Sequence, residues 1–253
     1  MKKLTYAITV LFLVMGIQIS AQDLTAKEII EKADDKFNGE KSGISEMTMT
    51  IVRPSWQRTV EFKSWNKDND KALTLITAPA GEKGQTFLKR GNEMWSWNPT
   101  ISRLIKLPPS MMSQGWMGSD YTNDDILKES SMVKDYTHKI IGTEKIGDRV
   151  CYKIKMTAKP DAAVIWGHQI RWIDKNDYLF IKSELYDEDG YLIRTETGSD
   201  IQKMDGRLIP TRIELVPEEE EGHKTIIEIK SIEFNVNIPE QFFSQQNMKR
   251  VRQ

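Results

Sequence analysis

Most of the chain alternates between apolar and polar residues with a period of two. The stretch EMTMTIV places Met47, Met49 and Ile51 on one side, and TVEFKSW does the same for Val60 and Phe62. This pattern predicts antiparallel strands with one face covered and one face in water. Similar runs follow along the chain: KALTLIT, GQTFLKR, EMWSWNP, SRLIKL, HKIIGTEKI, RVCYKIKMT, HQIRWIDK, YLFIKSELY, YLIRTETG, RLIPTRIELV and KTIIEIKSIEFNV. We therefore expect a mainly β protein with about a dozen strands.

The last of these runs changes phase halfway. Ile227 and Ile229 share one parity, whereas Ile232 and Phe234 have the other. One extra residue near Ser231 restores a continuous apolar face and bends the strand. Such a bulge is what a strongly curved sheet requires.

Two short segments carry the signature of a helix start. In LTAKEI, Thr25 suits the N-cap, Glu28 completes a capping box, and Leu24 and Ile29 form a hydrophobic staple. This helix is expected to run to about Asn38.

The second helix start is YTNDDI. Thr122 is the expected cap, Asp125 its partner three residues later, and Tyr121 and Ile126 the staple. Helix initiation explains two aspartates of this stretch and leaves Asp120 without an explanation.

The second helix belongs to a segment that interrupts the strands between about residues 108 and 131. Its stretch PSMMSQGWMG gathers Met111, Met112, Trp116 and Met117. Methionine is flexible and polarizable, and so adapts to irregular partners. Two readings follow: an ordinary core with methionine as filler, or a mobile lid over an apolar cavity.

The N-terminus reads as a secretory signal peptide over residues 1–21. Lys2 and Lys3 precede an apolar run from Tyr6 to Ile19 that is short for a membrane span, and cleavage is expected near Ala21. Residues 22–253 then form a single domain. Cys151 is the only cysteine, so the exported chain has no internal disulfide and depends on packing for its stability.

Charge and motifs argue against several function classes. The formal net charge is -1, so no basic field favours nucleic acid. His138, His168 and His223 have no metal-ligand spacing, and no phosphate loop or nucleophile elbow occurs. We expect no enzymatic activity, no catalytic residue, no metal and no cofactor.

One series of motifs resembles a known family. The run GNEMWSWNP is followed by SRLIKLP, then MGSDYTNDD, and the chain closes with NIPEQFF. This order is similar to the outer-membrane lipoprotein-sorting family of LolA-like periplasmic carriers, and MGSDYTNDD is typical of its uncharacterised branch. Gly91, Trp95, Asn98 and Pro99 match the carrier's residues in order.

The resemblance implies a fold and a function. The fold is an open half-barrel, a strongly curved antiparallel sheet whose concave face is covered by helices. The function is to shelter the acyl chains of lipoproteins or another lipid during transport through the periplasm toward the outer membrane. An inner-membrane lipid exporter and an outer-membrane acceptor are the implied partners. The alternative is a module of the same fold that senses or scaffolds envelope proteins without cargo.

The expected lipid-binding residues fall into two groups. The wall comprises Met47, Met49, Ile51, Val60, Phe62, Trp95 and Trp97, and the lid comprises Met111, Met112, Trp116 and Met117. The chain departs from the carrier at DNDKALTLI, where Lys71 stands in the region of a lid-closing arginine. Lysine does not form the same forked hydrogen bonds, so that contact is not carried over.

Overall fold

A computed structural model describes residues 24–38, 41–68, 70–91, 93–127, 131–162 and 164–252. The expected signal peptide lies outside these residues. The strands are β1 (Ser42–Arg53), β2 (Trp56–Lys67), β3 (Lys71–Ala78), β4 (Thr86–Arg90), β5 (Glu93–Asn98), β6 (Arg103–Lys106), β7 (Tyr136–Ile146), β8 (Arg149–Ala158), β9 (His168–Asp174), β10 (Phe180–Tyr186), β11 (Leu192–Met204), β12 (Arg207–Pro217) and β13 (Lys224–Phe234). The helices are α1 (Ala26–Asn38), η1 (Pro109–Met111), η2 (Trp116–Gly118), α2 (Asn123–Leu127), η3 (Glu240–Phe242) and α3 (Gln245–Met248).

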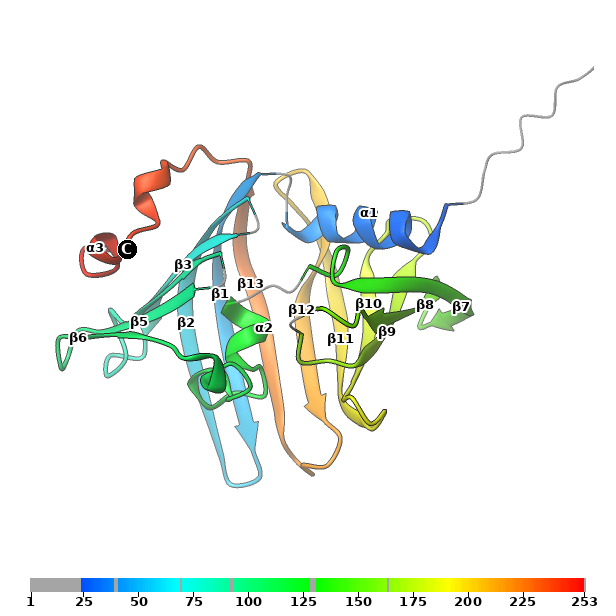
Figure 1. The fold of residues 1–253 in the computed structure, drawn as a ribbon, viewed down its shortest axis with the longest axis horizontal. Coiled ribbons are helices and arrows are strands. Elements are labelled where there is room, and N and C mark those ends of the chain that lie inside the picture. Colours follow the sequence, from blue (N-terminus) through cyan, green and yellow to red (C-terminus); the bar gives the residue numbers. More distant parts are fainter. Residues whose placement is uncertain are drawn as a thin grey trace, which may run out of the picture.

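The strands form one antiparallel sheet in the order β6-β5-β4-β3-β2-β1-β13-β12-β11-β10-β9-β8-β7. Figure 1 shows this sheet curving around an interior with α1 across one mouth. The edge strands β6 and β7 are consecutive in the chain, so the segment that joins them crosses the open side of the sheet. This segment holds η1, η2 and α2, and we call residues 107–127 the lid. The expected open half-barrel is confirmed.

The curvature has a local cause in the pairing of β1 with β13. Glu46 pairs with Ser231 and Met47 with Ile229, so Lys230 is an extra residue without a partner on β1. The bulge expected near Ser231 is therefore confirmed. It turns Ile227 and Ile229, which are buried, toward the same covered side as the residues beyond it.

Both capping boxes form as expected. The Thr25 hydroxyl accepts a hydrogen bond from the Glu28 amide at 3.2 Å, and the Thr25 amide donates to the Glu28 carboxylate at 2.7 Å. The corresponding distances for Thr122 and Asp125 are 3.1 and 2.7 Å. Leu24 packs in the same cluster as Ile29, whereas the side chain of Ile126 lies outside the described residues.

Two apolar clusters fill opposite parts of the concave side. One lies under α1, where Ile29 and Ile30 contact the inner faces of β8 and β9 through Ile154 and Ile173. The other lies under the lid, between the lid and strands β1 to β5, β12 and β13. The space between them is the cavity described below.

The convex side is also covered. The C-terminal segment folds back along β3 to β6, where Phe243, Met248 and Val251 pack against Leu73 and Leu88. Among the described residues, no helix is long and apolar enough to span a membrane.

Candidate functional site

A cavity of about 820 Å³ lies inside the curved sheet, between the lid and α1. Its walls come from both halves of the sheet, from the C-terminal half of α1 (residues 31–36) and from the C-terminal part of the lid (residues 121–125). The apolar part of the lining includes Met47, Phe62, Ile209, Ile213, Ile227 and Ile232. Pockets of about 300 to 1,000 Å³ are typical for small-molecule ligands.

The five aliphatic and aromatic wall residues expected on β1 and β2 all face this interior. Met47 and Phe62 line the cavity itself. Met49, Ile51 and Val60 are fully buried a few residues further along the strands, in the cluster covered by the lid. The concave face of β1 and β2 is thus apolar at these five positions, but only the part at Met47 and Phe62 is open.

Trp116 is the centre of the lid. It is fully buried, and its ring meets those of Phe62 and Phe87 edge-on, each with 5.5 Å between centroids. Met112 and Met117 pack around the same cluster, while Met111 accepts a hydrogen bond on its carbonyl from the Asn123 amide. The lid is therefore seated in the interior by one large aromatic anchor.

The placement expected for Trp95 and Trp97 is wrong. Both residues lie on the convex face, in the cluster covered by the C-terminal segment, and neither lines the cavity. Their neighbour Met94 is the residue of β5 that points inward, to the cluster under the lid. The two tryptophans have the same parity along β5, which places them on one face but does not determine which face that is.

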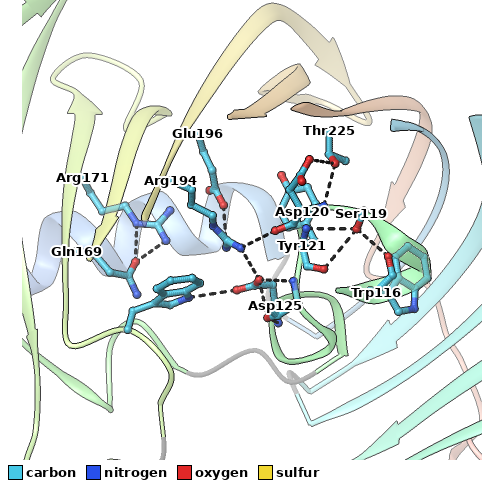
Figure 2. A network of polar contacts seen from close by, with 12 residues as sticks. Trp116, Ser119, Asp120, Tyr121, Asp125, Gln169, Arg171, Arg194, Glu196 and Thr225 are labelled. Atoms are coloured by element: carbon cyan, nitrogen blue, oxygen red, sulfur yellow. Dashed lines mark hydrogen bonds and ion pairs between the residues drawn. The ribbon is translucent and has the colours of Figure 1, made fainter. Parts of the chain in front are cut away.

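Asp120 anchors the lid to the sheet. Its carboxylate pairs with the Arg53 guanidinium of β1 at 2.9 and 3.1 Å and accepts a hydrogen bond from the Thr225 hydroxyl of β13 at 2.6 Å. Arg53 also donates to the Gly118 carbonyl at 3.0 Å. These contacts supply the explanation that the sequence lacked for Asp120, and Figure 2 shows the contact with Thr225.

A second anchor joins the lid to β11. Arg194 donates to the Asp125 carboxylate at 2.7 Å and to the Asp120 carbonyl at 3.1 Å, and it also pairs with Glu196 at 3.1 Å. Its guanidinium lies 4.5 Å from the centroid of the Trp166 ring, whose Nε1 donates to Asp125. Figure 2 shows Asp125 at the meeting point of these groups.

The tight turn of the lid depends on backbone conformations that favour glycine. Gly118 has φ +79°, and its neighbour Met117 has φ +53°, which L side chains rarely adopt. The Met117 carbonyl accepts a hydrogen bond from Arg58 of β2, which holds this conformation. Arg53, Arg58 and Arg194 thus reach the lid from three strands, and we call them the latch arginines.

The electrostatics of the latch follow from burial. Burial alone raises the pKa of Asp125, but the Arg194 charge and the hydrogen bonds from Arg194 and Thr122 together hold that pKa below its ordinary value. Burial and the nearby Glu196 raise the pKa of the Tyr121 hydroxyl. Asp125 is consequently charged and Tyr121 neutral at physiological pH.

Lys71 does not take part in the latch. Its ammonium pairs with Asp70 at 2.9 Å and with Glu240 of the C-terminal segment at 3.3 Å. The latch arginines come instead from β1, β2 and β11, far from the position that the resemblance compared. Each latch arginine contacts a part of the lid that is distant in the sequence, so local patterns do not reveal it. The one available signal was Asp120, a charged residue that helix initiation did not explain.

One group of possible metal ligands adjoins the latch. Oxygen or nitrogen atoms of Asp120, Glu220 and His223 lie within 4.8 Å of one another. Both Asp120 oxygens already have partners in Arg53 and Thr225, and the His223 Nδ1 pairs with Glu220. Of the three residues, Asp120 is therefore engaged by the contacts that hold the lid.

The fold matches solved structures over most of its length. A DUF1329 family protein from Desulfovibrio piger is 22% identical, with a TM-score of 0.80 over 88% of this chain and 97% of that one. A LolA superfamily protein from Nitrosomonas europaea is 23% identical, with a TM-score of 0.77 over 89% and 100%. A domain described as outer membrane lipoprotein-sorting, from Vibrio parahaemolyticus, is 21% identical, with a TM-score of 0.78 over 89% and 98%.

These likenesses define the class: the chain has the LolA-like half-barrel fold, with a lid across its open side. A family model described as "Uncharacterized protein" matches residues 68–250, so the chain belongs to that family. No curated protein matches the chain.

Proposed function

We propose that this protein is a periplasmic carrier that shelters the hydrocarbon chain of a lipid or lipoprotein in its cavity and takes it toward the outer membrane. The observation that carries the proposal is the cavity of about 820 Å³, left open on the concave side between two packed clusters. The protein acts by binding and release, without catalysis. An inner-membrane exporter and an outer-membrane acceptor are the proposed partners.

The energetics of a hydrocarbon chain explain the need for such a cavity. Burial gains about 0.8 kcal/mol per CH₂ group, so a chain of a dozen carbons gains on the order of 10 kcal/mol. A carrier with a rigid, closed pocket would release this cargo slowly. A lid attached by a few polar contacts lets binding and release proceed through a local opening, without unfolding of the sheet.

The lid of this protein has such an attachment. It meets the sheet through the latch arginines and through Trp116, and its base contributes Tyr121, Asp124 and Asp125 to the cavity wall. Opening of the lid would uncover the apolar residues beneath it and widen the cavity. Cargo binding and lid position are therefore coupled.

Native mass spectrometry of protein purified after periplasmic expression tests the proposal. Co-purifying lipid is the expected result. A protein without lipid that instead retains a stable protein partner would support the alternative, an envelope sensing or scaffolding module of the same fold.

A pair of variants on one strand sharpens this test. Ile213 lines the cavity from β12, whereas Val216 on the same strand is exposed. Ile213→Glu places a charge against the cargo and should reduce lipid occupancy about tenfold or more. Val216→Glu adds the same charge outside the cavity and should leave occupancy unchanged; equal effects of both substitutions would contradict the proposed binding site.

A further inference from the structure

Arg171 of β9 is one of the polar residues that line the cavity, together with Gln169 and Ser183. Its guanidinium donates to the Gln169 side-chain oxygen through Nε at 3.0 Å and through Nη2 at 2.6 Å. Nη1 donates to the Ser183 hydroxyl at 2.9 Å. Gln169 and Ser183 are themselves buried, so this arginine is held in place by two neutral, well-ordered partners.

Arg171 forms no direct ion pair within the described part of the chain. Asp125 and Glu196, the two nearby acidic groups, are both bound by Arg194, so the two carboxylates balance the charges of the two arginines but leave Arg171 without a direct partner. Figure 2 shows Arg171 near Arg194 and its two carboxylates, and the hydrogen bonds drawn from Arg171 all go to Gln169. Burial lowers the pKa of the Arg171 guanidinium more than the charge of Glu196 raises it.

The hydrogen bonds of Arg171 leave a defined binding end. A guanidinium carries five N–H donors, and three of them serve Gln169 and Ser183. Of the remaining two, one is on each terminal nitrogen. When Ser183 takes the Nη1 hydrogen on the side of Cδ, these two N–H groups are parallel and bind a carboxylate or phosphate through two hydrogen bonds.

We propose that Arg171 is the receptor for an anionic headgroup, so that the cargo is an acidic amphiphile with a carboxylate or phosphate at one end of a hydrocarbon chain. This inference rests on the proposed function and specifies its ligand class. The chain of the amphiphile lies along the apolar wall of Phe62, Ile213 and Ile227, which line the same cavity as Arg171. The headgroup accepts the two N–H groups of Arg171 that no described residue accepts.

Binding of matched probes tests the inference. Dodecanoate, dodecyl phosphate and dodecanol share one hydrocarbon chain, and inorganic phosphate supplies the headgroup alone. The two anionic probes should bind the full-length mature protein at least about tenfold more tightly than dodecanol, since a charge-assisted hydrogen bond is stronger than a neutral one. Arg171→Gln should abolish this preference and leave dodecanol binding unchanged.

A second variant retains the arginine. Gln169→Glu places a carboxylate beside Arg171, neutralises it, and should also abolish the preference for anionic probes without loss of the fold. Arg212→Gln is the matched control, because Arg212 is paired with Glu228 and Glu214 outside the cavity.

The outcomes separate the two proposals. Equal affinity for dodecanoate and dodecanol would overturn the headgroup inference and leave the carrier function standing. If inorganic phosphate binds as tightly as dodecyl phosphate, the hydrocarbon chain adds nothing to binding. That result would contradict the proposed amphiphilic ligand and indicate a site for small anions. Failure of all three chain-bearing probes to bind would overturn the carrier function itself.

Discussion

Replacement of Arg194 by leucine should free the lid and destabilise the protein. The Arg194 side chain is only 4% exposed and makes three hydrogen-bonded contacts: with Asp125 at 2.7 Å, with Glu196 at 3.1 Å and with the Asp120 carbonyl at 3.1 Å. Its removal leaves two carboxylates without their cation in a poorly hydrated place. Loss of one partner from a buried pair costs about 3 to 5 kcal/mol.

Urea unfolding gives this free energy, and the melting temperature provides a second measure. At about 2 to 4 °C for each kcal/mol in a protein of this size, the melting temperature should fall by about 6 to 20 °C. Arg212→Leu is the control, because Arg212 is about one-third exposed and forms only surface ion pairs, worth about 1 kcal/mol or less.

The double variant Arg194→Leu with Asp125→Asn separates the ion pair from simple loss of packing. Removal of both charges should cost less than the sum of the two single substitutions, by about 0.5 to 3 kcal/mol. Limited proteolysis within the lid should also accelerate in Arg194→Leu and recover in part in the double variant. The reasoning would be refuted if Arg194→Leu cost no more than Arg212→Leu.

Three further predictions follow from buried groups. Trp116→Ala should lower the free energy of unfolding by about 3 to 5 kcal/mol, whereas Trp56→Ala, at a position 49% exposed, should change it little in the same urea titration. The pKa of the Cys151 thiol is raised to about 11 by burial, so a thiol reagent at pH 8 should label the unfolded protein and spare the native one. Because the pKa of Asp125 is held below its ordinary 3.8, the stability it contributes is complete above that value and is lost as the pH falls below it. The cost of Asp125→Asn, measured by urea unfolding, should therefore shrink between pH 6 and pH 3.

Local sequence signals predicted the parts of the fold that depend on neighbours in the chain. The capping boxes at Thr25 and Thr122, the strand alternation and the bulge at Lys230 are all determined within a few residues. The bulge also indicated a curved sheet, and the family resemblance then favoured the lid over the reading of methionine as core filler. The strand alternation and the bulge agree because both reflect the continuous apolar face on the concave side of the sheet.

The errors arose where the sheet is covered on both sides. A strand covered on one side only would point its large apolar side chains toward the cavity, which is where Trp95 and Trp97 were expected. The convex face of β5 is covered as well, by the C-terminal segment, and both tryptophans pack there. The apolar residues of that segment, such as Phe243 and Met248, were the available signal, since they need a surface to pack on. Arg171 and the latch arginines escaped notice because strand alternation indicates burial but not the partner of a charge.

The central claim is that a hydrocarbon chain lies in the cavity between the lid and α1, and NMR can test it with methyl-labelled methionine. Met47 lines the cavity, whereas Met248 is buried on the convex side under the C-terminal segment. In protein loaded with dodecanoate, we predict nuclear Overhauser effects from the chain protons to the Met47 methyl group and none to that of Met248. Contacts with Met248 alone, or an unchanged Met47 signal in saturated protein, would contradict the account.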